Sequence, residues 1–290
     1  MHLTVGDAAN LPFEDDMFAM VMFSPPYLSQ RTYGEDNIAR KLNDWVDWMH
    51  VCIKESLRVC SGPVVVVISG SGGANYEPAP ELLLASLFDC DGVYAYRPCI
   101  WNKNAAPAGD SYFSNDWEYV QVYCKHPKPP IWKPTELQIP LKYSSGGHFR
   151  QRKKDGERSK GSTYPTHKIR KRPSNVLDLE QLPTDITDYT DPVDPTSLLR
   201  VTVGGGHMGW KHATEYNEAP FPERLVEPFV KVFTNRGDKI LDPFCGSGTT
   251  PCVAEILGRV GYGVDIRADQ IEKAKLRETY TQEMIAKLKA

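Results

Sequence analysis

Ser24, Pro25, Pro26 and Tyr27 form a short, stiff and polar tetrapeptide directly after an apolar run over residues 18–23. The prolines fix the backbone, the serine hydroxyl and the proline carbonyls can accept hydrogen bonds, and the tyrosine offers an aromatic face. The apolar run predicts a buried strand, and open α/β sheets bind ligands at the carboxyl ends of their strands. The tetrapeptide is therefore a candidate for chemistry, whereas alone it would indicate only a rigid turn.

A second stretch, residues 239–250 (KILDPFCGSGTT), runs from a predicted strand through glycines into a predicted helix. Such a turn lets the backbone approach a ligand, and the helix start offers N–H groups and partial positive charge. Asp242 precedes the turn, and Asp265 ends the next predicted strand, 23 residues farther along, where dinucleotide folds place an acid on ribose hydroxyls. Both acids could instead cap helices or form turns, but their joint spacing favours a cofactor site.

Two common nucleotide motifs are missing from this turn. It offers only Gly246 and Gly248, without the third glycine of GxGxxG, which disfavours a nicotinamide dinucleotide. The chain also lacks GxxxxGKS and GxxxxGKT, so a P-loop nucleotide hydrolase is disfavoured.

Together, SPPY and DPFCGSGTT resemble the motifs of the DNA amino-methyltransferases, which use S-adenosylmethionine to methylate the exocyclic nitrogen of cytosine or adenine. The catalytic motif comes first and the cofactor motif last, which resembles the beta class of this family. The resemblance covers nearly the whole chain. It implies an α/β, Rossmann-like methyltransferase fold with a mixed, mostly parallel seven-stranded sheet, circularly permuted, and an inserted target-recognition region.

The resemblance assigns the cofactor contacts. Asp242 would accept a hydrogen bond from the methionyl amino group, and Asp265 would hold the ribose. Asp7 would contact the adenine ring, and Phe221 with Pro222 would form one wall of the pocket. The expected cofactor-binding residues are Asp7, Phe221, Asp242, Pro243, Phe244, Gly246, Gly248, Thr249 and Asp265.

The resemblance also implies a mechanism. The lone pair of the target amine is delocalised into the base, so the nitrogen is a weak nucleophile. Ser24 Oγ and the Pro25 carbonyl would accept hydrogen bonds from its two N–H groups and turn the lone pair toward the sulfonium methyl, for a direct displacement. Pro26 would stiffen the loop, and the Tyr27 ring would stack on a base flipped out of the duplex. These four residues are the expected catalytic residues.

The serine bears on which base is methylated. In this family Ser in the first motif position is typical of cytosine-N4 enzymes, whereas adenine-N6 enzymes usually carry Asp or Asn. We therefore expect N4-methylcytosine, with adenine N6 as the alternative. Cytosine C5 chemistry needs a thiolate, but Cys99 and Cys252 follow prolines inside a predicted strand and a predicted helix, so both are interpreted as packing residues.

Two regions are expected near the nucleic acid. The resemblance places residues 101–103 beside the flipped base, although Trp101 could equally pack in the core. Residues 125–172 hold 14 Lys or Arg against three acids, within a chain of net charge −3, which favours phosphate contacts over a solvated face. The expected partner is double-stranded DNA; RNA, a protein amide or an inactive binding relative remain alternatives. The expected DNA-binding residues are Arg150, Arg152, Lys153, Lys154, Arg170, Lys171 and Arg172.

Composition sets the broader class. With 290 residues, 41% of them hydrophobic, the chain can form one large α/β domain with an insertion. Seven cysteines without a CxxC pair or a His/Cys cluster indicate reduced thiols and no metal site. No apolar run approaches the roughly 20 residues of a membrane helix. We expect a soluble cytoplasmic protein without membrane contacts, bacterial or phage-encoded; oligomeric state, recognition sequence and any restriction partner are open.

Alternating elements support this organisation. A helix over residues 44–59, with Asn43 as N-cap, would connect the strands at 18–23 and 64–68. If residues 239–241 and 261–264 are the first two strands of a Rossmann-like half, residues 3–6 and 18–23 supply the third and fourth. Further strands are expected at 93–101 and 118–123, and further helices at 81–88, 222–233, 249–257 and from 269 onward. The expected domains are a catalytic half (1–125), a basic insertion (126–211) and a cofactor half (212–290).

Overall fold

The computed structural model describes residues 1–28, 41–72, 76–103, 117–137 and 222–289, and five two-residue strands between 139 and 177. Strands of the main sheet are β1 (His2–Val5), β2 (Met20–Phe23), β3 (Val64–Ile68), β6 (Tyr94–Ala95), β7 (Cys99–Asn102), β8 (Trp117–Cys124), β13 (Val176–Leu177), β14 (Lys239–Asp242) and β15 (Val260–Asp265). The helices are α1 (Leu42–Val59), α2 (Ala79–Phe88), η1 (Pro134–Leu137), α4 (Glu223–Phe233), α5 (Thr249–Ile256) and α6 (Ala268–Lys289).

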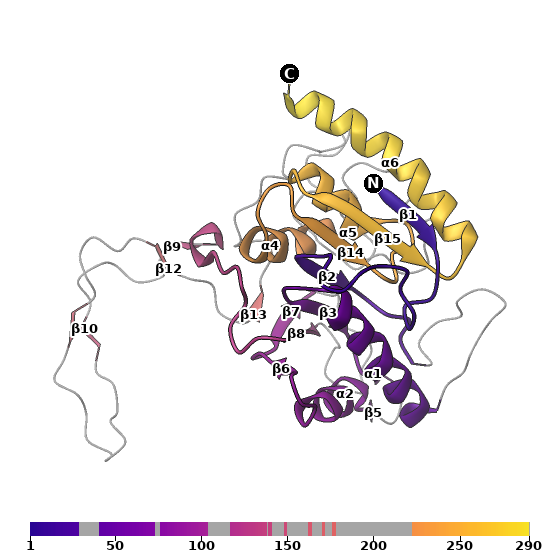
Figure 1. Ribbon diagram of the computed structural model, residues 1–290. Helices are drawn as coiled ribbons and strands as arrows, with labels where there is room; N and C mark the ends of the chain where they lie inside the picture. Colours follow the sequence, from indigo (N-terminus) through magenta and orange to yellow (C-terminus); the bar gives the residue numbers. More distant parts are fainter. Residues whose placement is uncertain are drawn as a thin grey trace, which may run out of the picture.

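The remaining strands form three small antiparallel pairs. β4 (Ser71–Gly72) pairs with β5 (Tyr76–Glu77), β9 (Ile139–Pro140) with β12 (Arg170–Lys171), and β10 (His148–Phe149) with β11 (Ser162–Thr163). β9, β10 and β12 lie well to one side of the main sheet (Figure 1). These two pairs of the basic insertion are therefore separate from the main sheet.

The main sheet runs in the order β1-β15-β14-β2-β3-β8-β7-β13, and β6 also pairs with β8. The pairs from β1 to β3 are parallel, and β8 is antiparallel to β3 and β7. The last two strands in sequence, β14 and β15, thus lie between β1 and β2, and Figure 1 shows β1 beside β15. This order confirms the predicted circular permutation, with the ends of the described chain between the second and third strands.

The sheet has nine described strands rather than the expected seven. The predicted strand at 93–101 is divided into β6 and β7, because Pro98 has no N–H to give to a ladder and restricts the residue before it. The ninth strand, β13, comes from the insertion and pairs in parallel with β7. A two-residue apolar segment has no alternation that sequence periodicity could detect.

Helix α1 begins at Leu42 with Lys41 as N-cap, so the predicted N-cap Asn43 is wrong. The amide of Trp45 donates to the carbonyl of Lys41, which places Asn43 inside the first turn. No side chain caps this end, and the apolar face of the helix determines its position instead. That face buries Trp45, Met49 and Ile53 against the sheet.

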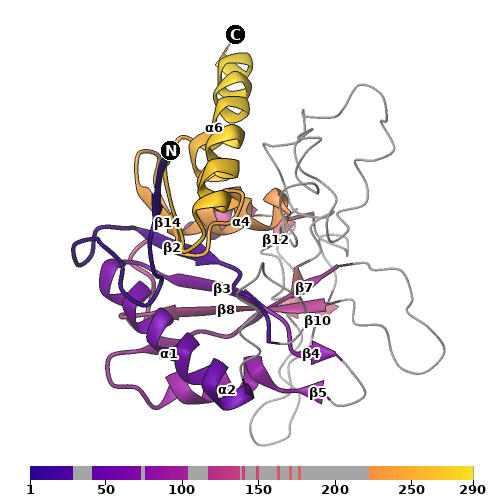
Figure 2. The ribbon, with the colours of Figure 1, turned by 90° about the vertical axis from the view of Figure 1, so that its right-hand side faces the viewer.

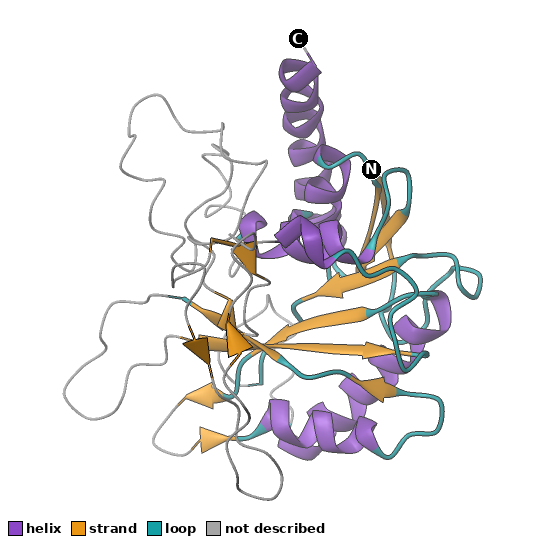
Figure 3. Cartoon of the chain, turned by 90° about the vertical axis from the view of Figure 1, so that its left-hand side faces the viewer, coloured by secondary structure: helices purple, strands orange, loops and turns teal. Residues whose placement is uncertain are grey.

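Helices cover both faces of the sheet, with α1 and α2 on one side and α4 and α6 on the other (Figures 2 and 3). Side chains of β2 alternate between the two cores: Met20 and Met22 pack with α4 and α5, and Val21 and Phe23 pack with α1. All four are fully buried, as expected for a central strand covered on both faces. No helix within the described ranges is long and apolar enough to cross a membrane.

Two glycines of β15 let α5 and the turn before it pack closely on the sheet. A Cβ at Gly261 would lie 2.3 Å from the carbonyl oxygen of Pro251, and one at Gly263 would lie 2.8 Å from Cys245 Sγ. Neither position has room for a side chain. The glycines therefore allow the glycine turn and α5 to lie directly against β15.

A buried ion pair joins α6 to α4. Arg277 donates to Glu223 and, at 3.0 Å, to Thr249 Oγ1, and both charged side chains are at most 1% exposed. Removing one partner from such a pair leaves a buried charge in a medium of low dielectric constant. The pair consequently couples the C-terminal helix to the start of α5.

We predict that Arg277→Met lowers the free energy of unfolding by about 3–5 kcal/mol, because Glu223 loses its buried counter-charge. The matched control is Lys275→Met in the same helix, where the pair with Glu272 is exposed, and exposed pairs contribute about 0–1 kcal/mol. Urea unfolding followed by circular dichroism measures both. Equal losses in the two variants would contradict the prediction.

Candidate active site

The two candidate stretches lie side by side because their strands are neighbours. β14 pairs in parallel with β2, with Ile240 opposite Met20 and Leu241 opposite Val21. Ser24–Tyr27 and the turn after Asp242 therefore leave the sheet at the same edge. The rings of Phe23 and Phe244, 5.1 Å apart between centroids, connect the two loops directly.

The tetrapeptide is tied to the antiparallel side of the sheet through a chain of hydrogen bonds. Ser24 Oγ donates to Tyr27 Oη at 3.2 Å, and Tyr27 Oη donates to Glu118 Oε2 at 2.7 Å. Lys103 Nζ donates to the other carboxylate oxygen, Oε1, at 3.2 Å. Glu118 and Lys103 are 7% and 8% exposed, so a nearly buried ion pair stands behind the motif.

Helix α1 holds the tetrapeptide from the other side. Trp45 Nε1 donates to the carbonyl of Pro26 at 2.9 Å, while Pro25 is buried and Ser24 and Tyr27 are partly exposed. The two prolines and this hydrogen bond fix the direction of the loop carbonyls. A partly exposed hydroxyl on a rigid loop is available to a ligand entering at the sheet edge.

Sequence reasoning missed the roles of Glu118 and Trp45. Helical spacing identified Trp45 only as a core residue, and it is indeed 3% exposed, but its indole N–H also binds the motif. Glu118 was only the first residue of a predicted strand. One signal in the sequence could have identified Glu118. It is an acid at a position where the alternation of side chains along a buried strand directs it inward.

The glycine turn has the backbone that its sequence predicts. Gly246 and Gly248 have φ values of 47° and 83°, in the left-handed region that favours glycine. Gly248 is the N-cap of α5 and brings no side chain to the helix start, and Thr249 is 3% exposed. Pro243, at the beginning of the turn, is buried. A helix N-terminus without a side-chain cap favours an anionic group.

Two carboxyl groups flank the turn. Asp242 is 1% exposed and accepts from the amide of Phe244 at 2.9 Å, and burial raises its pKa to about 7. Asp265 accepts from the amides of Gly246, at 2.9 Å, and of Arg267, and burial raises its pKa as well. The charge of Asp265 adds to the rise at Asp242. Both acids would gain from a cationic ligand.

The thiol of Cys245 lies within the same turn and is 4% exposed. Burial raises its pKa well above the ordinary value, and the charges of Asp242 and Asp265 raise it further. Burial also raises the pKa of Cys99 to about 11 and that of Cys252. Thiols held in the protonated form fit the packing interpretation of Cys99 and Cys252.

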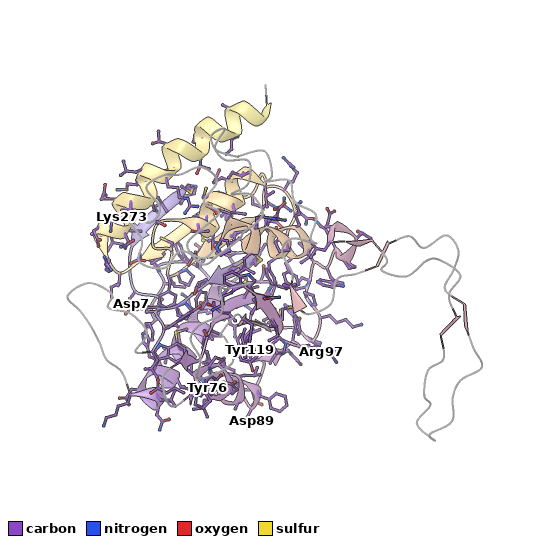
Figure 4. The ribbon with its side chains drawn as sticks, turned by 180° about the vertical axis from the view of Figure 1, so that it is seen from behind. Asp7, Tyr76, Asp89, Arg97, Tyr119 and Lys273 are labelled. Carbon is purple, nitrogen blue, oxygen red and sulfur yellow. The ribbon has the colours of Figure 1, made fainter. Side chains whose placement is uncertain are left out.

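Asp7 follows β1 and is exposed; Figure 4 labels it. Its Oδ1 accepts from the amide of Ala9 at 2.9 Å, so it forms the local turn expected of an Asp after a strand. The amide of Gly6 donates to the Asp265 carbonyl, which places the end of β1 beside the end of β15. Asp7 and Asp265 thus belong to the same sheet edge.

Other predicted residues are less informative. Pro222 is the buried N-cap residue of α4, and Trp101 is 2% exposed within the core, which supports its packing interpretation. Arg170 and Lys171 form β12, of which only the backbone is described. Phe221 and five of the basic residues lie outside the described residues: Arg150, Arg152, Lys153, Lys154 and Arg172.

Comparison with known proteins agrees with the geometry. The family model N6_N4_Mtase, described as DNA methylase, matches residues 18–276. The type II methyltransferase M.HpaI of Haemophilus parainfluenzae is 22% identical over 270 residues, which cover 91% of this chain and 69% of that protein. Similarity therefore extends through both candidate stretches.

Solved structures share the fold. The cytosine-N4-specific PvuII DNA methyltransferase superposes with a TM-score of 0.61 at 17% identity, covering 98% of this chain and 90% of that one. Protein TTHA0409 of Thermus thermophilus, solved in complex with S-adenosyl-L-methionine, has a TM-score of 0.55 at 20% identity, covering 97% and 93%. With the family model spanning most of its length, the chain belongs to the N6/N4 DNA methylase family.

Proposed function

We propose that this protein is a site-specific DNA methyltransferase that transfers a methyl group from S-adenosylmethionine to N4 of a flipped cytosine. The observation that carries the proposal is the adjacency of Ser24 and Asp242 at the ends of paired strands β2 and β14. One supplies a neutral acceptor for an amine, and the other supplies a buried acid for a cation. Membership of the DNA methylase family supports both assignments.

The residues of the cofactor half fit S-adenosylmethionine. Burial raises the pKa of Asp242 to about 7, and the methionyl ammonium group would favour its charged form. The amides at the glycine turn and the start of α5 suit the methionyl carboxylate. Asp265 keeps acceptor capacity for ribose hydroxyls, and we retain Asp7 and Phe221 as proposed contacts. When bound, the cofactor supplies an electrophilic methyl group on a sulfonium.

The chemistry of this chain is positioning. Ser24 Oγ and the Pro25 carbonyl would accept from the two N–H groups of the target amine, which draws the hydrogens aside and exposes the lone pair. Trp45 occupies the Pro26 carbonyl, so that the loop keeps its direction. The partly exposed Tyr27 ring would stack on the base, since reaching N4 requires the nucleotide to leave the duplex.

We propose that residues 1–125 and 212–290 form the two halves of the methyltransferase domain and that residues 126–211 form a target-recognition insertion. The pairing of β13 with β7 supports an insertion that returns to the sheet beside β7. Its basic residues would neutralise phosphates, including Arg150, Arg152, Lys153, Lys154, Arg170, Lys171 and Arg172. The bacterial relatives support a bacterial or phage origin.

Adenine N6 is the alternative target, since the family includes both chemistries. We favour cytosine because the first motif residue is a neutral serine rather than an acid or amide. RNA methylation would share the basic insertion and the same two strand ends. An inactive relative would not need Ser24, Tyr27 and Asp242 all in place.

We predict that purified protein, incubated with labelled S-adenosylmethionine and duplex DNA, transfers label to N4-methylcytosine, because Ser24 is a neutral acceptor. Digestion to nucleosides and mass spectrometry identify the product, with RNA and protein substrates as parallel controls. Label on N6-methyladenine would replace the cytosine assignment. Absence of transfer to any DNA containing varied sequence would overturn the proposed function.

We predict that Ser24→Ala lowers kcat by about 10²-fold, as loss of one preorganised hydrogen-bonding group in a transition state does. Cofactor affinity should stay within about twofold, since Ser24 belongs to the β2 loop rather than to the glycine turn. Ser86→Ala on α2, where the hydroxyl donates to Leu83, is the matched control. Unchanged turnover in Ser24→Ala would refute the role of this hydroxyl.

We predict that cofactor affinity weakens on acidification through the raised pKa of Asp242. The ammonium group binds the ionised carboxylate, so with a pKa near 7 the dissociation constant should rise roughly tenfold between pH 7.5 and pH 6.0. Asp242→Asn should bind weakly and lose this dependence. Calorimetric titrations of both proteins and of Asp269→Asn, an exposed acid of α6, provide the comparison; an unaltered pH profile in Asp242→Asn would exclude this carboxylate.

A further inference from the structure

The hydrogen bonds behind the tetrapeptide have a fixed direction. An ionised carboxylate can only accept hydrogen bonds. The Tyr27 hydroxyl must therefore use its single proton to donate to Glu118 Oε2, 2.7 Å away. The Tyr27 oxygen then accepts from Ser24 Oγ at 3.2 Å. Because Ser24 also has one proton, its oxygen presents lone pairs, and no proton, to a further partner.

We propose that Glu118 is a positioning residue for methyl transfer, because its carboxylate orients both hydroxyls so that Ser24 Oγ faces the target amine as an acceptor. This inference rests on the proposed function and extends it to a residue on β8. The target NH₂ group carries two protons and a weakly available lone pair. A serine proton pointing at the nitrogen would compete for that lone pair, and an accepting oxygen would release it.

Lys103 fixes the carboxylate in this role. It follows β7, which is antiparallel to β8, with Trp101 opposite Glu118 and Asn102 opposite Trp117. Its ammonium binds Oε1 at 3.2 Å, which directs Oε2 toward Tyr27. The strand pairing thus specifies which carboxylate oxygen serves the motif.

The placement differs from that of a purely structural ion pair. A buried pair needs every lone pair satisfied, and it is often no more stabilising than apolar residues of the same shape. Here one oxygen of the Glu118 carboxylate, which is 7% exposed, accepts a hydrogen bond from a tyrosine of the tetrapeptide rather than from a backbone amide. The free-energy cost of burying the Glu118 carboxylate is therefore tied to a fixed orientation of the Tyr27 and Ser24 hydroxyls.

Glu118→Gln tests the direction of the chain. The amide nitrogen can donate to Tyr27, and the hydroxyl protons can then point the other way, so that Ser24 offers a proton to the amine. We expect kcat to fall at least thirtyfold, with dissociation constants for cofactor and duplex DNA within about twofold of wild type. A merely structural role would change binding or stability instead of kcat alone.

The matched control is a second tyrosine–glutamate contact outside the site. Glu81 of α2 accepts from the hydroxyls of Tyr76, at 2.8 Å, and Tyr119, at 3.2 Å, and Figure 4 labels both tyrosines. Glu81→Gln should leave kcat unchanged. It removes a carboxylate that likewise accepts from tyrosine hydroxyls, at an exposed position, without touching the tetrapeptide.

A double-mutant cycle with Tyr27→Phe isolates the relay. Removing the Tyr27 hydroxyl breaks the link, so Glu118→Gln should add less than about threefold to the loss of kcat in that background. If Glu118→Gln does not fold with Lys103 left unpaired, Glu118→Gln with Lys103→Met replaces it, because that combination removes both charges.

Full turnover in folded Glu118→Gln, or losses that multiply independently with those of Tyr27→Phe, would overturn the inference while leaving wild-type methyl transfer intact. Failure of the wild-type protein to methylate DNA would instead overturn the proposed function. The two failures are therefore distinguishable in one set of assays.

Discussion

The site depends on the parallel pairing of β14 with β2. This pairing puts the end of the strand carrying Asp242 beside the end of the strand carrying Ser24, although 218 positions separate the two residues. Long-range pairing costs chain entropy that local contacts cannot repay. The cores on both faces of β2, together with close approach at Gly261 and Gly263, supply the compensating burial.

Both halves of the site hold acids in poorly solvated positions. Asp242 is destabilised in its charged form, whereas Glu118 is held beside Lys103. The difference has a chemical meaning: the acid at the glycine turn is the one we propose binds a cationic ligand, and the acid behind the tetrapeptide is paired with Lys103. We thus propose that one poorly solvated acid, Asp242, serves ligand binding and that the other, Glu118, serves orientation of the tetrapeptide.

Much of this arrangement could be predicted from sequence, because each central element carries its own local signal. The apolar run before SPPY and the glycine turn after Asp242 have strong patterns. The order of the strands follows once residues 239–241 and 261–264 are taken as the first two strands of a Rossmann-like half. Residues that act through tertiary contacts could not be found in this way. Glu118 touches Tyr27 only because β8 lies across the sheet, Trp45 reaches Pro26 only after α1 packs, and β13 is too short to show periodicity.

The thiol of Cys245 illustrates how the glycine turn suits its proposed ligand. Sulfur in the anionic form is a far stronger nucleophile than an aromatic amine, and Cys245 is buried in the loop that we propose binds an alkylating sulfonium. Burial, and after it the charges of Asp242 and Asp265, raise the pKa of this thiol and keep the sulfur protonated. Burial, together with the charges that we propose attract the reagent, would therefore also shield the protein from alkylating itself.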